Sequence, residues 1–125
     1  MTTQAKNDDT KVKIELELSY LIKRYAKNKD RYKDLVDSDD FESAVHYLPD
    51  SIICKRHQLF VKNFKLDKLD KITEELLAKI FSNSVDNSSS VEQIVVATAV
   101  VKALKEQYQL CIAINNFIKY GTFYA

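Results

Sequence analysis

The sequence contains very little glycine or proline. Gly121 and Pro49 are the single examples of their kinds among 125 residues, whereas average proteins contain about 7% glycine and about 5% proline. Strand-rich folds use both residues at their many tight turns, and loops that cradle phosphate groups need several glycines. The shortage therefore argues against a strand-rich fold and against a glycine-rich nucleotide-binding loop.

Cysteine is also scarce, and long apolar runs are absent. Cys54 and Cys111 are the two cysteines, and residues 1–9 lack the apolar core of a secretory signal. We therefore expect free thiols and a cytoplasmic location. No stretch approaches the roughly 18 uninterrupted apolar residues of a membrane-spanning helix, so we expect no membrane partner.

Neither sign of charge dominates the chain. It has 19 basic and 18 acidic residues and a net charge of +1, so any attraction to nucleic acid must be local. Its 46% of apolar and 30% of charged residues are typical of a globular protein. We expect a disordered N-terminal tail over residues 1–9 and a single helical domain over residues 10–125.

Residues 11–25, KVKIELELSYLIKRY, fit two secondary structures. Apolar and polar residues alternate from Val12 to Tyr20, as in a half-buried strand. Glu, Leu, Lys and Arg favour a helix, however, and no other segment offers a convincing partner strand. We favour the helix. Its buried face would consist of Ile14, Leu18, Leu21, Ile22 and Tyr25.

The second half of the chain has the clearest helical signals. Residues 67–81 have the apolar periodicity of an amphipathic helix, and Ser90 with Gln93 forms a capping box that opens a mostly apolar helix over about residues 91–119. We therefore predict an all-α fold, a compact bundle of four to six helices with a long, largely buried C-terminal helix. The core residues that we expect are Leu76, Ile80, Val100, Val101 and Leu104.

Residues that could carry chemistry are few. Cys54 and His57 have the C-x-x-H spacing of two zinc ligands, but zinc needs three or four. We therefore expect a buried thiol and a surface histidine, with no metal and no cofactor. No pattern of residues indicates catalytic machinery, so we do not expect an enzyme.

The first helix leaves three apolar residues on its outer side: Val12, Leu16 and Tyr20. They predict contact with another protein or with a second copy of the chain, since exposed apolar groups mark interaction sites. The alternative is that residues 115–125 fold back and cover them within one molecule.

Segment 20–33 is basic and interleaved with tyrosines, a pattern that can hold phosphates and stack on bases. Its basic residues are Lys23, Arg24, Lys27, Lys29, Arg31 and Lys33. We interpret the protein first as a small helical interaction module, such as an adaptor, inhibitor, immunity-type protein or assembly subunit. A nucleic-acid-binding accessory protein is the alternative.

Overall fold

A computed structural model describes residues 3–83 and 90–123 of the chain. Its long helices are α1 (Thr3–Asp37), α3 (Leu48–Asn63), α4 (Leu69–Ser82) and α5 (Val91–Tyr120). The connecting elements are a short helix, α2 (Phe41–Ala44), and two 3-10 turns, η1 (Val45–Tyr47) and η2 (Leu66–Lys68). The described residues form no strand. The all-α prediction is therefore confirmed, and residues 11–25 are helical.

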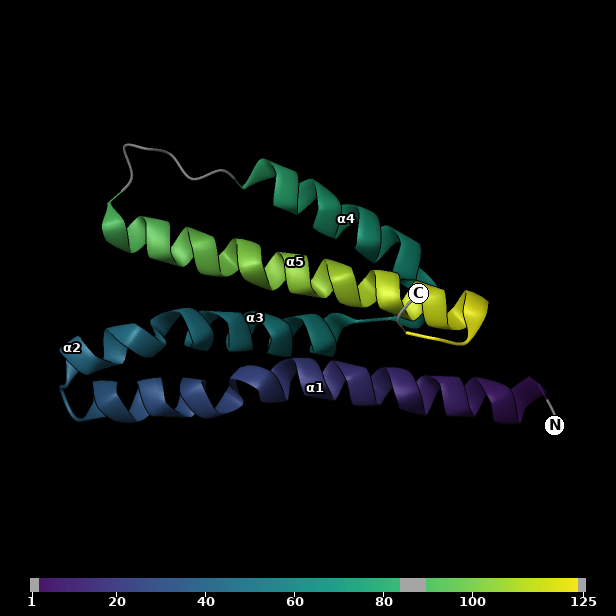
Figure 1. The fold of residues 1–125 in the computed structure, drawn as a ribbon, viewed down its shortest axis with the longest axis horizontal. Coiled ribbons are helices and arrows are strands. Elements are labelled where there is room, and N and C mark those ends of the chain that lie inside the picture. The colour runs from purple at the N-terminus through teal and green to yellow at the C-terminus, as the bar shows by residue number, and fades with distance from the viewer. Residues whose placement is uncertain (1–2, 84–89, 124–125) are drawn as a thin grey trace.

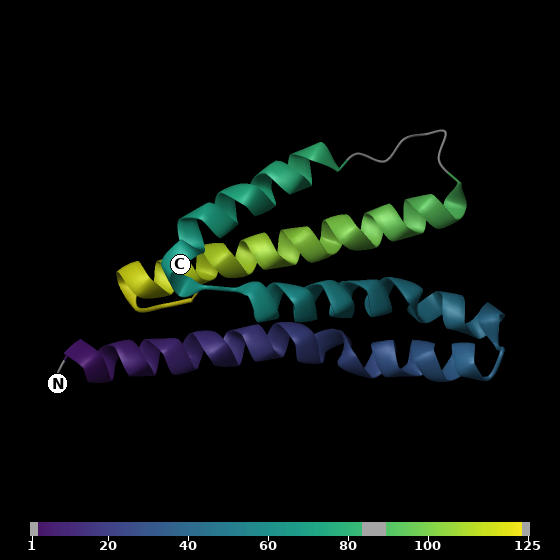
Figure 2. The same cartoon turned by 180° about the vertical axis from the view of Figure 1, so that it is seen from behind.

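The long helices lie in a row, in the order α1, α3, α5 and α4 (Figures 1 and 2). Helix α3 packs on both α1 and α5, and α5 packs on both α3 and α4, whereas α1 touches α5 over a short stretch. Helix α4 diverges from α5 toward its C-terminal end (Figure 1). As a result α1 and α4 form the two edges of the molecule.

Helix α1 buries the face that its periodicity predicts. Ile14, Leu18, Leu21 and Tyr25 are buried, and Ile22 is half-buried. The helix begins at Thr3, so residues 3–9, which we expected to lie in the tail, belong to α1. Extending an existing helix by residues such as Gln, Ala and Lys has little cost, because the costly nucleus is already formed.

Helix α5 begins and ends at identifiable caps. The Oγ of Ser90 accepts a hydrogen bond from the backbone N–H of Gln93, whose Oε1 accepts one from the Ser90 N–H. At the other end Gly121 has a φ of 78°, and its N–H donates to the carbonyl of Phe117. A left-handed residue after a helix favours glycine. The predicted capping box and the long helix are both confirmed.

Less of the apolar surface of α5 is buried than the sequence suggests. Leu76 and Leu104 are buried, while Ile80 and Val100 are half-buried against the core cluster. Val101 was predicted to be in the core; it is also half-buried, but it lies beside Lys102 and outside the core clusters. The reason is that α5 has neighbouring helices mainly on two sides, so part of its apolar surface faces solvent.

Over the described residues, no helix is long and apolar enough to cross a membrane. Residues 84–89 belong to the Ser- and Asn-rich connection before α5 and lie outside the described part of the chain.

Candidate functional site

The outer side of α1 carries three exposed apolar side chains, Val12, Leu16 and Tyr20, which we call the α1 stripe. They are 62%, 48% and 48% exposed. Spaced four residues apart, they follow one side of the helix, opposite buried Leu18. Because α1 is the edge of the row (Figure 2), Val12 and Leu16 line no hollow with another helix of the described chain, while Tyr20 lies beside a shallow hollow that α1 shares with α5. The three side chains are exposed on one helix side, and their contact with another protein stays a prediction.

The C-terminal segment packs elsewhere. Phe123 stacks on Phe117, with ring centroids 4.3 Å apart, and packs against the core. The Nζ of Lys13 lies 5.4 Å from the centroid of the Phe117 ring. Up to Phe123, the last residue described, this segment leaves the α1 stripe exposed.

The six basic residues of segment 20–33 do not form one patch. Lys23, Lys27 and Arg31 follow the α1 stripe on the same side of the helix, at about 100° per residue. Lys29 and Lys33 lie instead beside a hollow that α1 shares with α3. The structure therefore divides the predicted nucleic-acid surface between two sides of α1.

Three of the basic residues already have partners within the molecule. Arg24 pairs with Glu106 at 3.4 Å, Lys33 pairs with Asp37 at 3.4 Å, and the Arg31 guanidinium lies 5.8 Å from the Tyr47 ring centroid. Of the tyrosines, Tyr25 is buried, and Tyr20 is exposed. Tyr32 is half-buried beside the hollow between α1 and α3, so Tyr20 is the one tyrosine of the segment that is fully available for stacking on bases.

A buried polar network joins α1, α3 and α5. The Nε2 of His57 lies 2.9 Å from Oε1 of Glu106, and the hydroxyl of Tyr25 donates to Oε2 of the same carboxylate at 2.6 Å. The side-chain nitrogen of Gln107 lies 3.1 Å from Nδ1 of His57. Since that amide nitrogen donates to Nδ1, we assign the His57 proton to Nε2, which donates to Glu106.

The network holds its groups in defined protonation states. Burial lowers the pKa of His57 and, together with Glu106, raises the pKa of Tyr25. Burial alone would raise the pKa of Glu106, but hydrogen bonds from Tyr25 and His57 outweigh it, so that pKa is lowered. At neutral pH the network thus contains a carboxylate, a neutral imidazole and a neutral phenol.

Sequence reasoning missed this network and placed His57 on the surface, whereas His57 is 0% exposed. Its spacing from Ile53 is four residues, the spacing of neighbours on one helix face, which was a usable signal. Cys54, the other residue of the C-x-x-H pair, is buried as expected and has its Sγ 3.9 Å from the carbonyl of Ile22. The described residues contain no group of three or more His, Cys, Asp or Glu side chains that could hold a metal ion.

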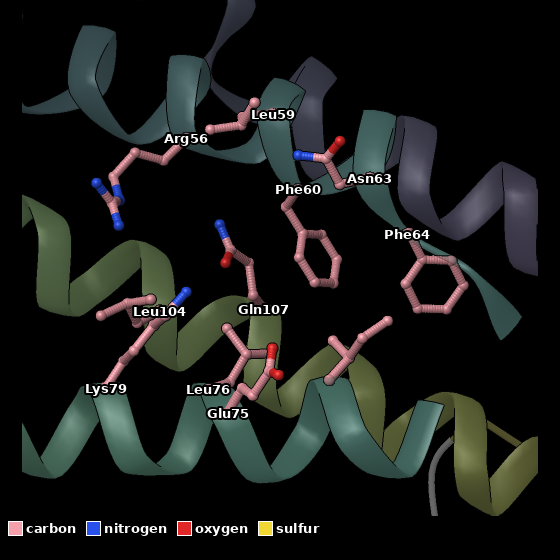
Figure 3. Close-up of a pocket in the computed structure, with 11 residues that line it drawn as sticks. Arg56, Leu59, Phe60, Asn63, Phe64, Glu75, Leu76, Lys79, Leu104 and Gln107 are labelled. Atoms are coloured by element: carbon pink, nitrogen blue, oxygen red, sulfur yellow. The ribbon is translucent and has the colours of Figure 1, made fainter. Parts of the chain in front are cut away.

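A hollow of about 310 Å³ lies between α3 and α4, and α5 forms its floor through Leu104 and Gln107 (Figure 3). Arg56 and Lys79 lie at one end, and Phe60 and Phe64 lie toward the other. Within the described chain, Nε of Arg56 is the one buried side-chain nitrogen or oxygen without a hydrogen-bond partner. Glu75 shares the lining with the two cations, so the hollow has no single charge that would select one kind of ligand.

Acidification should destabilise the protein in two stages. The pKa of His57 is lowered from 6.5 in the folded state. As the pH falls below about 6.5, this histidine is therefore protonated in the unfolded chain before it is protonated in the folded one, and the free energy of unfolding falls. The lowered pKa of Glu106 stabilises the fold above its ordinary value of 4.5, and this contribution is lost as pH falls below that value. Melting temperatures from circular dichroism should show both stages.

Histidine variants identify the first stage. His57→Gln should lower the melting temperature at neutral pH and remove the fall that begins near pH 6.5, while exposed His46→Gln should leave the profile unchanged. A melting temperature that rises as the pH falls through this region would contradict the assignment of a neutral His57.

Searches against protein-family models, curated proteins and solved structures find no match for this chain. Its function is therefore inferred from its own residues. His57 is fully buried with both ring nitrogens engaged, so it has no direct access to a substrate. The α1 stripe is exposed and can contact another molecule directly.

Proposed function

We propose that the protein is a small, non-catalytic interaction module that binds a protein surface through the α1 stripe. The observation that carries this proposal is the exposure of Val12, Leu16 and Tyr20 on one side of an edge helix. Large apolar side chains that share one exposed face are typical of contact surfaces, and aromatic residues are enriched at their centres.

The charges beside the stripe support the same proposal. Lys23 and Lys27 continue its side of the helix and are exposed, and the Nζ of Lys23 lies 5.9 Å from the centroid of the Tyr20 ring. Charges at the rim of an apolar contact steer association and fix its orientation more than they add affinity.

Two substitutions in the stripe test the proposal. The double variant Leu16→Ser with Tyr20→Ser should lose association while keeping its melting temperature, because both side chains are about half exposed in the monomer. Association is measured by light scattering, for self-association, and by binding to a purified partner obtained from the native host.

The matched control replaces two exposed apolar residues away from α1, Leu59→Ser with Phe81→Ser. This variant should associate as the wild type does. If the stripe variant instead loses several degrees of stability with unchanged association, the stripe is part of the monomer core and the proposal is wrong. Salt-sensitive retention on RNA that requires Lys23 and Lys27, with no protein association, would favour the nucleic-acid alternative.

A further inference from the structure

One acidic and one basic residue on the side of the α1 stripe lie at equal distances from Leu16. Asp9 and Lys23 are exposed and lie seven residues before and after Leu16, while Val12 and Tyr20 lie four residues before and after it. At about 100° per residue, all five fall within about 80° on one side of the helix. The series therefore has a centre at Leu16 and opposite charges at its two ends.

This symmetry points to one partner. We propose that the α1 stripe binds the stripe of a second copy of the chain, with the two α1 helices antiparallel and a two-fold axis passing beside Leu16. The inference rests on the proposed function, which it narrows to self-association. In a two-fold contact each surface must be complementary to itself.

In the antiparallel arrangement, the five residues from Asp9 to Lys23 form a surface that is complementary to itself. Leu16 meets Leu16 of the second copy, Val12 meets Tyr20, and Asp9 meets Lys23 at both ends. A parallel arrangement would place Asp9 against Asp9 and Lys23 against Lys23, and like charges in direct contact oppose association.

The position of α1 in the fold leaves room for this contact. Helix α1 is the edge of the row (Figure 1), so a second molecule can extend the row without displacing any described helix. From Asp9 to Lys23 the contact would span 14 residue steps, or about 21 Å at 1.5 Å per residue. Three apolar side chains per copy make a small contact, so we expect a weak dimer whose population depends on protein concentration.

Charge reversal tests the pairing. Asp9→Lys or Lys23→Asp alone should weaken the dimer about tenfold in sedimentation velocity, because each change turns two symmetry-related attractions into repulsions. The double variant Asp9→Lys with Lys23→Asp should restore wild-type association. Lys62→Asp, on the exposed surface of α3, is the control and should have no effect.

Disulfide trapping tests the axis. Two Leu16→Cys chains should cross-link readily when oxidised with copper phenanthroline, because that residue adjoins its own copy. Two Lys27→Cys side chains should not, since the antiparallel arrangement separates them by 22 residue steps, or about 33 Å. The native Cys54 and Cys111 are buried, and the wild-type chain under the same oxidant is the control.

The outcomes separate the antiparallel dimer from the broader proposal that the α1 stripe binds a protein. Restored association in the double charge variant and selective trapping at Leu16 would support the antiparallel dimer. Equal trapping at Lys27, or failure of the double variant to restore association, would overturn it. A wild-type protein that is monomeric at every concentration would also overturn it, while loss of a foreign partner in the Leu16→Ser with Tyr20→Ser variant would leave the proposed function intact.

Discussion

Replacing Ile114 with aspartate should leave the protein unfolded at room temperature. Ile114 is 0% exposed and belongs to the core cluster that α1, α4 and α5 share. Truncating a buried isoleucine costs about 2–5 kcal/mol, and an unpaired buried carboxylate adds several kcal/mol of lost hydration. Together these costs approach the total stability of a typical domain, about 5–15 kcal/mol. Circular dichroism should show the loss of the helical double minimum.

The same substitution at Ile112 is the matched control. Ile112 lies two residues away on α5 and is 37% exposed, so its carboxylate can reach water. We expect a folded protein with a melting temperature lower by a few degrees. If Ile112→Asp were the more damaging of the two, the rotation of α5 in the bundle would be wrong.

Local signals were sufficient to predict the helices. The scarcity of glycine and proline, the capping box at Ser90 and the periodicity of residues 67–81 each depend on neighbours within one or two turns. For residues 11–25 the strand pattern was cleaner than the helix pattern. The helix prediction was nevertheless correct. The two patterns were hard to separate because Val12, Leu16 and Tyr20 are spaced by four residues, which satisfies alternation and one helix face equally well.

The predicted surface followed from the same kind of information. Once α1 is a helix, the positions of Ile14 and Leu18 fix which side is buried, and the stripe lies opposite. The basic segment was less predictable, because pairing of Arg24 with Glu106 and of Arg31 with the Tyr47 ring depends on how separate helices pack.

The buried network could not be predicted from local patterns. The spacing of His57 from Ile53 could indicate that His57 is buried, but no local pattern connects it with Glu106, which lies 49 positions away. Their burial results from the packing of α3 between α1 and α5, which brings His57 of α3 against Glu106 and Gln107 of α5. A buried polar group without a partner is costly, so satisfying one of these residues requires the others.

Removing the carboxylate from this network should have the second large effect. Glu106→Ala leaves the Tyr25 hydroxyl and the Nε2–H of His57 without their acceptor. Each unsatisfied buried donor costs about 1–3 kcal/mol, so we expect a loss of about 2–6 kcal/mol and a melting temperature lower by roughly 10 °C or more. Arg24→Ala is the control. Because Arg24 is 59% exposed, losing its ion pair should cost less than about 1 kcal/mol.

The Glu106→Gln variant tests whether the Glu106 side chain stabilises the fold by its hydrogen bonds or only by filling space. The new amide oxygen can accept from Tyr25, and its nitrogen can donate to Nε2 of His57 if the imidazole proton moves to Nδ1. The Gln107 amide can then turn so that its oxygen accepts from Nδ1–H, and every group keeps a partner. We therefore expect Glu106→Gln to be much more stable than Glu106→Ala.

Nitrogen NMR of His57 should show a change of tautomer from Nε2–H to Nδ1–H, with exposed His46 as the internal reference. Equal destabilisation by both substitutions, or an unchanged tautomer in a stable Glu106→Gln variant, would contradict this account, because the network would then not determine where the His57 proton lies.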